Sequence, residues 1–202
     1  MKIDISNDEI KLKKETNIID EFVIDICKIL AKHFNYVIVS GYLSILFGKI
    51  RGTEDIDVFI KKTDLQTFKK FYNELKQKGY VIFNARSDKD AYDMLTKKIA
   101  PRIAKKNEFI PNVELQFPKD KWGLQSLKEK IRVELNGDEF FISSIEMNIA
   151  FKIYLGSRKD IDDACYLYLL FKKLRHLNEK KIREICSQLD VSPNILEMCK
   201  NE

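Results

Sequence analysis

Between residues 17 and 60, the spacing of apolar side chains changes several times between that of a helix and that of a strand. In residues 17–33, apolar positions recur every three or four residues, which predicts an amphipathic helix. Two short runs rich in β-branched residues, 36–39 and 56–60, are typical of buried strands. Between them the dipeptide Ser40-Gly41 interrupts the pattern, and residues 43–50 return to helical spacing. The sequence therefore predicts a helix, a strand, a short helix and a second strand, in that order.

The middle of the chain has the pattern of a small α/β unit. Thr63-Asp64-Leu65-Gln66 fits a capping box, so we expect a helix that begins there and stops at Gly79. Strand-like segments follow at 80–83, 113–117, 131–133 and 140–142. The last two fit a hairpin around Asn136-Gly137. The charged stretch 86–108 is consistent with a helix, a hairpin or a loop, and these alternatives stay open.

The last part of the chain has helical patterning only. Ser143, Ser157 and Asn178 each precede an amphipathic run and fit helix starts. Together with the mixed pattern upstream, this predicts an α+β fold. We expect two units: an α/β core with an N-terminal helix over residues 1–142, and a C-terminal helical lobe over residues 143–202.

Composition and charge narrow the class of protein. Of the 202 residues, 45% are hydrophobic and 33% are charged, which supports a packed core and excludes a disordered or low-complexity chain. The net charge of +5 is compatible with an anionic partner such as a nucleotide or RNA, but the dense basic stripe of a duplex-DNA binder is missing. Neither a membrane-spanning run nor an apolar leader is recognisable, so we expect a cytoplasmic protein without membrane contact.

The cysteines and histidines give no sign of a metal or nucleophile site. Cys27, Cys165, Cys186 and Cys199 are scattered and form no C-x-x-C pair, which argues against zinc. In a reducing compartment we expect all of them to be buried thiols. The two histidines have no Cys or Asp partner at a spacing typical of nucleophilic catalysis.

The segment 40–57 concentrates the candidate chemistry. At Ser40-Gly41 a strand ends and a helix begins, which leaves free backbone N–H groups and lets an anion approach the glycine closely. Asp55 and Asp57 share one face of the next strand. Two such carboxylates repel one another unless a cation lies between them, and Mg²⁺ prefers such hard oxygen ligands. Glu114, on another alternating strand, is the candidate third carboxylate of a two-metal site.

These residues resemble the signature of the nucleotidyltransferase superfamily of the DNA polymerase β type. That signature is a Gly-Gly or Gly-Ser turn, a short helix, an Asp-x-Asp pair and a third carboxylate on a later strand. The chain is most similar to the abortive-infection and toxin–antitoxin nucleotidyltransferases and their uncharacterised relatives. Their pattern is matched by Gly41, Gly48, Arg51, Thr53, Asp55, Ile56 and Asp57. The segment 158–163 is similar to their downstream Lys-Asp-x-x-Asp segment, whereas Tyr42 stands where the family has Gly or Ser.

The resemblance implies a mixed sheet flanked by helices and an enzyme that moves a nucleoside monophosphate from an NTP to a hydroxyl group. It implies that Asp55, Asp57 and Glu114 are catalytic and bind two Mg²⁺ ions, and that Glu114 helps to deprotonate the attacking hydroxyl. The residues expected to bind the nucleotide are Ser40, Gly41, Tyr42, Ser44, Arg51 and Lys159. The acceptor stays open among a tRNA, a protein, an antibiotic and another small alcohol, as do the choice of NTP and the oligomeric state.

Two other functions are consistent with the same sequence. If Tyr42 closes the nucleotide site, the chain is a catalytically inactive binding or antitoxin-like module of the same fold. The basic run 97–106 is compatible with an RNA-binding adaptor, whose affinity for RNA falls steeply as salt is added. Binding of Mg-nucleotide and the salt dependence of RNA binding separate these alternatives from a transferase.

Overall fold

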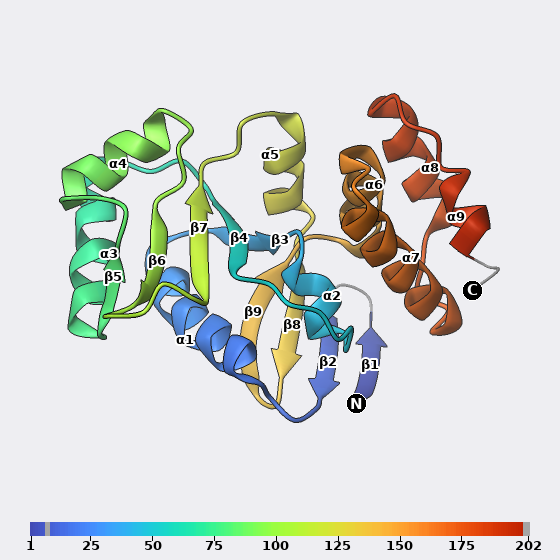
Figure 1. Cartoon of the computed structure of the whole chain (residues 1–202), viewed down its shortest axis with the longest axis horizontal. Helices are drawn as coiled ribbons and strands as arrows, with labels where there is room; N and C mark the ends of the chain where they lie inside the picture. Colours follow the sequence, from blue (N-terminus) through green and yellow to red (C-terminus); the bar gives the residue numbers. More distant parts are fainter. Residues whose placement is uncertain (7–8, 200–202) are drawn as a thin grey trace.

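The computed structural model describes residues 1–6 and 9–199, which form one mixed sheet flanked by helices (Figure 1). The strands are β1 (Lys2–Ser6), β2 (Glu9–Lys13), β3 (Tyr36–Val39), β4 (Asp55–Ile60), β5 (Tyr80–Ile82), β6 (Arg102–Lys105), β7 (Asn112–Gln116), β8 (Ile131–Leu135) and β9 (Asp138–Ile142). The helices are α1 (Ile18–His33), α2 (Tyr42–Leu46), α3 (Leu65–Gln77), α4 (Asp88–Thr96), α5 (Lys121–Lys128), α6 (Ile145–Leu155), α7 (Arg158–Lys173), α8 (Glu179–Gln188) and α9 (Ile195–Met198). The α+β class predicted from the sequence is confirmed.

The sheet brings strands from distant parts of the chain together at its centre. Its strand order is β1-β2-β8-β9-β3-β4-β7-β6-β5. β3 runs antiparallel to β4, and β4 runs parallel to β7. On the other side of β3 lies β9, which runs parallel to it. Because paired strands set their side chains at matching levels, residues of β3, β4 and β7 on the same face become neighbours.

The alternation within β4 separates a buried face from a polar one. Every second residue from Ile56 to Ile60 is at most 1% exposed and belongs to the hydrophobic core, to which α1 and α3 also contribute. Asp55, Asp57 and Phe59 point to the opposite face and remain partly exposed. The predicted carboxylates therefore lie on the face of the sheet that is turned away from these core residues.

An N-terminal hairpin extends the sheet and was not predicted. β1 and β2 pair antiparallel, and β2 joins β8 in parallel. Ile10 and Leu12 of β2 are each 1% exposed, whereas Lys11 between them is exposed to solvent. The two-residue period was present in the sequence, but it was carried by few apolar side chains in a charged segment. Their burial on the sheet stabilises the hairpin.

The middle of the chain contains three elements that the sequence pattern left open or missed. The stretch 86–108 contains α4 and β6. Helix α5 was not predicted; Asp120 caps it and accepts hydrogen bonds of 3.0 Å from the N–H groups of Trp122 and Gly123. The predicted helix starts near residues 63 and 143 are each displaced by one residue, because Asp64 caps α3 and Ser144 caps α6.

Helices α6–α9 follow β9 and gather at one end of the molecule, where α6 packs against both α7 and α8 (Figure 1). The proposed boundary after residue 142 coincides with the end of β9. The division into units 1–142 and 143–202 stays a prediction, and residues 7, 8 and 200–202 of these units lie outside the described residues. Among residues 1–6 and 9–199, none of the helices combines the length and the apolar character that crossing a membrane requires.

The cysteines differ in part from the expectation of four thiols. Cys27 and Cys186 are buried and free, as expected. Cys165 of α7 forms a disulfide with Cys199, the residue that follows α9. Two cysteines 34 positions apart give no local sequence signal for such a bond, because the fold alone brings α7 and α9 together.

Candidate active site

The three predicted carboxylates lie on two neighbouring strands. In the parallel pairing of β4 with β7, Asp57 lies directly opposite Glu114, and Asp55 lies opposite Asn112. Asp55 and Asp57 also share one face of β4. The fold thus places acidic side chains from two distant segments of the sequence on neighbouring strands. That the three form one metal site stays a prediction.

Two of these carboxylates are held by neighbouring polar side chains. The Asn112 side chain donates a 2.8 Å hydrogen bond from Nδ2 to Asp55 Oδ1. Arg102, on the adjoining strand β6, forms an ion pair with Glu114. Neither contact was predicted from the sequence, because both depend on the order of strands in the sheet; Arg102 was noted only as part of the basic run 97–106.

The third carboxylate, that of Asp57, has a perturbed acidity. Burial, followed by the negative charge of Glu114 and then that of Asp55, raises the pKa of the Asp57 carboxyl from its usual 3.8 to about 6. A hydrogen bond from the Ser40 side chain and the positive charge of Lys152 act in the opposite direction. Asp57 is therefore ionised at neutral pH at a cost in free energy, which a bound cation would offset.

The donor chemistry of this cluster fits a hard divalent cation, but its arrangement is not complete. Among the described residues, no three His, Cys, Asp or Glu side chains are positioned to hold a metal ion as they stand. The ion pair with Arg102 engages Glu114. Asn112 Oδ1 is buried beside Asp55 and has no hydrogen-bond partner. Carboxylate and amide oxygens are suitable ligands for Mg²⁺. Glu114 can join them only if its ion pair with Arg102 opens.

The turn between β3 and α2 depends on Ser40 and Gly41. Ser40 has a φ of 67°, in the left-handed region that residues other than glycine rarely adopt. Gly41 has ordinary helical dihedral angles, yet a Cβ atom there would lie only 2.8 Å from Arg51 Nη2. The absence of a side chain at Gly41 therefore admits the Arg51 guanidinium, which occupies space that the sequence had suggested for an anion.

Two residues predicted to bind the nucleotide turn their side chains into the protein. Tyr42 and Ser44 are both 0% exposed. The Tyr42 hydroxyl donates a 2.9 Å hydrogen bond to Asp20, and burial together with the Asp20 charge raises the Tyr42 pKa well above its usual range. The Ser44 hydroxyl is buried without a partner. Neither side chain reaches the surface or lines the cavity described below, so the Ser44 side chain does not contact a nucleotide as predicted. For Tyr42 the prediction concerns the backbone N–H, and it stays a prediction.

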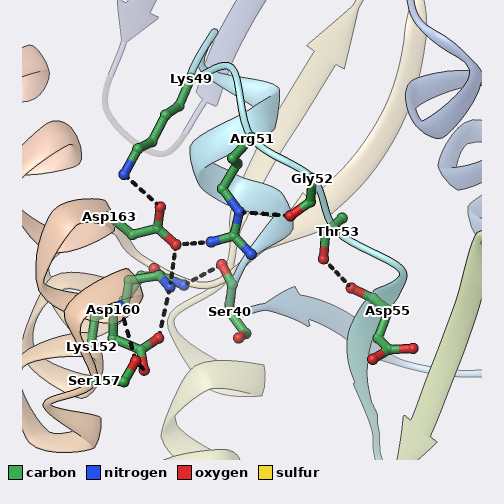
Figure 2. A network of polar contacts seen from close by, with 11 residues as sticks. Ser40, Lys49, Arg51, Gly52, Thr53, Asp55, Lys152, Ser157, Asp160 and Asp163 are labelled. Atoms are coloured by element: carbon green, nitrogen blue, oxygen red, sulfur yellow. Dashed lines mark hydrogen bonds and ion pairs between the residues drawn. The ribbon is translucent and has the colours of Figure 1, made fainter.

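Three cationic side chains near the turn pair with one buried carboxylate on α7, that of Asp163 (Figure 2). Asp163 is fully buried and accepts hydrogen bonds from Lys49 Nζ at 2.9 Å and Lys152 Nζ at 2.8 Å, and it also pairs with Arg51. Asp160 adds a second carboxylate 3.4 Å from Lys152. Burial raises the pKa of Asp163, but these hydrogen bonds and charges outweigh it and hold the pKa below its usual value. Three cations face two carboxylates, so the group carries net positive charge.

Lys152 is the functional candidate that the sequence interpretation missed. It is 2% exposed and close enough to Asp57 to lower the pKa of that carboxyl. Lys159, which was expected to bind the nucleotide, is exposed at the start of α7. The available signal was a lysine within the largely apolar helical run of residues 145–155, followed by acids at 160 and 163. A lysine in such a run is buried only when it is paired.

A cavity of about 220 Å³ lies beside the carboxylates. Phe59 of β4 and Gln116 of β7 line it, together with side chains of α5 and α6. Ser40 and Lys152, the two residues that lower the pKa of Asp57, also line it. The cavity, the acidic cluster and the cations around Asp163 are therefore parts of one continuous region.

Comparison with known proteins supports the fold. No protein-family model matches the sequence, and no curated protein is significantly similar to it. Among solved structures, the chain is similar to the crystal structure of an antigenic nucleotidyltransferase-like protein from Paracoccidioides brasiliensis, with a TM-score of 0.52. The match covers 89% of this chain and 91% of the other, at 18% sequence identity. At this identity the similarity concerns the fold alone, and the fold of this protein is nucleotidyltransferase-like.

Proposed function

We propose that this protein transfers a nucleoside monophosphate from an NTP to a hydroxyl group in the presence of Mg²⁺. The observation that carries the proposal is the register of β4 and β7, which sets Glu114 opposite Asp57 and beside the face that carries Asp55. A nucleotidyltransferase-like fold with carboxylates on neighbouring strands supports the same reaction class.

In this proposal Asp55 and Asp57 hold the divalent cations, and Glu114 joins them after its ion pair with Arg102 opens. Mg²⁺, when bound, supplies Lewis acidity and neutralises charge on the phosphates. The acceptor oxygen forms a bond to the α-phosphorus while the bond from that phosphorus to the bridging oxygen breaks. Pyrophosphate leaves, and the proton of the acceptor hydroxyl passes to Glu114.

The cations around Asp163 have the position and the charge to stabilise the leaving group in this proposal. Arg51 lies against the turn at Gly41, and Lys152 faces the cavity next to the carboxylates. Because Asp163 fixes both side chains, they are held in place before the substrate arrives. Preorganised positive charge of this kind stabilises negative charge that develops in the transition state.

The test is incorporation of label from α-³²P-labelled NTPs in the presence of Mg²⁺, with a tRNA pool, a protein lysate and small alcohols as acceptors. We expect incorporation with the wild-type protein and loss of at least about 100-fold with Asp57→Asn, because removal of one charged group at such a site has effects of this size. The matched control is Asp162→Asn, which removes an exposed carboxylate of α7. Undiminished incorporation with Asp57→Asn would reject the proposed role of the cluster.

One observation favours a second candidate, a nucleotide-binding module without transferase activity. The ion pair between Arg102 and Glu114 occupies the third carboxylate. If that pair persists when Mg-NTP is present, the chain binds nucleotide without transferring it, which calorimetry combined with the labelling assay detects. The same pair engages the arginine of the basic run 97–106, which weakens the alternative of an RNA-binding adaptor.

A further inference from the structure

The cavity next to the acidic cluster continues the same face of the sheet. Phe59 follows Asp57 by two residues on β4, and Gln116 follows Glu114 by two residues on β7. On a strand, such neighbours on one face are about 6–7 Å apart. If the phosphate of a ligand lies at the carboxylates, a ring attached a few bonds from that phosphate can therefore reach this cavity.

The size and the walls of the cavity fit one flat ring. Its volume of about 220 Å³ is below the roughly 300–1,000 Å³ of pockets that enclose whole small molecules. The aromatic rings of Phe59, Trp122 and Phe151 line it, and the last two rings meet edge to face at 5.8 Å. Aromatic side chains of this kind bind nucleobases by contact with their planar faces.

Two buried polar atoms in the wall have no protein partner. Ser143 is 1% exposed and Asn148 is 4% exposed, and both line the cavity. The Asn148 amide nitrogen donates to the Ser40 carbonyl oxygen at 3.4 Å, which leaves Asn148 Oδ1 as a free acceptor. The Ser143 hydroxyl is likewise without a partner. Buried polar atoms are nearly always hydrogen-bonded, and these two belong to residues that line a cavity, so both have hydrogen-bonding capacity left for a ligand there.

We propose that this cavity holds the nucleobase of the NTP, and that Asn148 and Ser143 determine which base is accepted. Asn148 Oδ1 accepts a hydrogen bond from a ring N–H or an exocyclic amino group, and the Ser143 hydroxyl pairs with the adjacent polar atom of the base. This assignment rests on the proposed function, because it takes the phosphates to lie at Asp55 and Asp57. Lys152, which lines the cavity and pairs with Asp163, connects the two ends of the nucleotide site.

The single tryptophan of the chain, Trp122, reports on the cavity. The experiment titrates the protein with the Mg complexes of ATP, CTP, GTP and UTP, and with Mg-tripolyphosphate, while Trp122 emission and the heat of binding are recorded. We expect at least one NTP to change the emission, with unequal affinities among the four, and tripolyphosphate to bind without changing it. An equal response to tripolyphosphate would overturn the assignment.

The decisive variants compare two buried hydroxyls. Ser143→Ala removes an unpartnered hydroxyl inside the cavity, and Ser44→Ala removes an unpartnered hydroxyl of a fully buried side chain elsewhere. Neither loses a protein hydrogen bond, so both variants are expected to fold. We expect Ser143→Ala to raise the Kd of the preferred NTP about 2- to 10-fold and to leave the Kd of tripolyphosphate unchanged, whereas Ser44→Ala changes neither. Asn148→Leu should in addition reduce the differences among the four NTPs.

The outcomes separate this inference from the proposed function. If NTPs bind by calorimetry, with unchanged Trp122 emission and equal affinities for Ser143→Ala and Ser44→Ala, the base lies elsewhere and the inference fails, while the transferase proposal stands. If NTPs bind in the cavity and the labelling assay detects no transfer, the inference stands and the proposed reaction fails. If no NTP binds, both fail.

Discussion

The Tyr42 hydroxyl donates a 2.9 Å hydrogen bond to the carboxylate of Asp20, and neither side chain is exposed to solvent. Asp20 also forms a 2.8 Å ion pair with Lys14, so its charge is compensated. The phenol ring consequently belongs to the core below the turn at Ser40-Gly41. The tyrosine that stands at position 42 in place of the expected Gly or Ser therefore does not block the turn, and it does not argue against the transferase proposal.

Replacing Tyr42 tests this assignment. Tyr42→Phe keeps the ring and removes the hydrogen bond to Asp20, so we expect the free energy of unfolding to fall by about 1–2 kcal/mol. We expect nucleotide binding and transfer to be unchanged, because the ring does not reach the site. Urea denaturation and the labelling assay measure the two effects. A large gain or loss of nucleotide affinity in this variant would show that residue 42 contacts the ligand.

The acidity of Asp57 predicts a pH-dependent stability in the absence of metal. The folded-state pKa of about 6 lies above the unfolded value of 3.8, so between these values the folded protein binds more protons than the unfolded chain. The contribution of Asp57 to the free energy of unfolding therefore falls as the pH rises from about 4 to 6. We expect Asp57→Asn to remove this dependence and to be about 1–2 kcal/mol more stable at pH 7.

Urea denaturation with a chelator, at pH values from about 4 to 8, measures this difference. Mg²⁺ should restore the stability of the wild-type protein at pH 7 and leave that of Asp57→Asn unchanged, because only the wild type carries the full acidic cluster. Asp162→Asn, on the exposed side of α7, is the control and should follow the wild type at every pH. A constant difference between the wild-type and Asp57→Asn profiles over this pH range would contradict the electrostatic origin of the effect.

The ion pair between Arg102 and Glu114 predicts a competition with metal. Arg102→Gln frees the carboxylate, so we expect the Kd of Mn²⁺, measured by calorimetry, to fall about 3- to 10-fold. Arg132→Gln is a matched control, because Arg102 and Arg132 are both 44% exposed and both pair with a glutamate of a neighbouring strand. Equal Mn²⁺ affinities in the two variants would show that the Arg102 pair does not compete.

Asp163 is expected to be the most sensitive position for stability. Asp163→Asn leaves Lys152, which is 2% exposed, with a single partner at 3.4 Å, and it leaves Arg51 without its carboxylate. Loss of one member of a buried ion pair costs about 3–5 kcal/mol. Urea denaturation should show a loss of this order, against less than about 0.5 kcal/mol for the neighbouring control Asp162→Asn. A loss below 1 kcal/mol in Asp163→Asn would mean that the cations are solvated.

Because Gly41 lies close to Arg51, a side chain at position 41 should collide with the guanidinium, although the backbone angles there suit any residue. Gly41→Ala places a methyl group 2.8 Å from Arg51 Nη2, so the guanidinium must move away from Asp163. We expect a loss of about 1 kcal/mol in the free energy of unfolding and weaker binding of tripolyphosphate. Gly52→Ala is the control, because a Cβ there meets no atom within 4 Å. Equal tripolyphosphate affinity in both variants would exclude Arg51 from the phosphate site.

The acidic cluster could be predicted because it follows from a two-residue period. Alternation in β4 and β7 put Asp55, Asp57 and Glu114 on defined faces, and the register of the strands made Asp57 and Glu114 neighbours. The turn at Ser40-Gly41 was visible as a break between two apolar patterns. What each turn residue contacts was not visible, since the partner of Gly41 is the side chain of Arg51.

The polar partners could not be predicted because they depend on contacts between distant segments. Arg51 and Asp163 are 112 positions apart, and no local period relates a loop residue to a buried acid on α7. The ion pair of Arg102 with Glu114 required the knowledge that β6 lies next to β7. Lys152 was the exception, since a lysine in a largely apolar helix signals a buried partner, and that signal was overlooked.

The position of β7 has a consequence for when the acidic cluster forms during synthesis. β7 follows β6 in the chain but lies between β4 and β6 in the sheet. Strand pairs that close long stretches of chain form slowly compared with local hairpins. Asp57 therefore gains Glu114 as a neighbour only when β7 takes its place between β4 and β6. A ribosome-bound chain that ends before β7 has β4 without this neighbour, and the repulsion between Asp57 and Glu114 begins only when β7 pairs with β4.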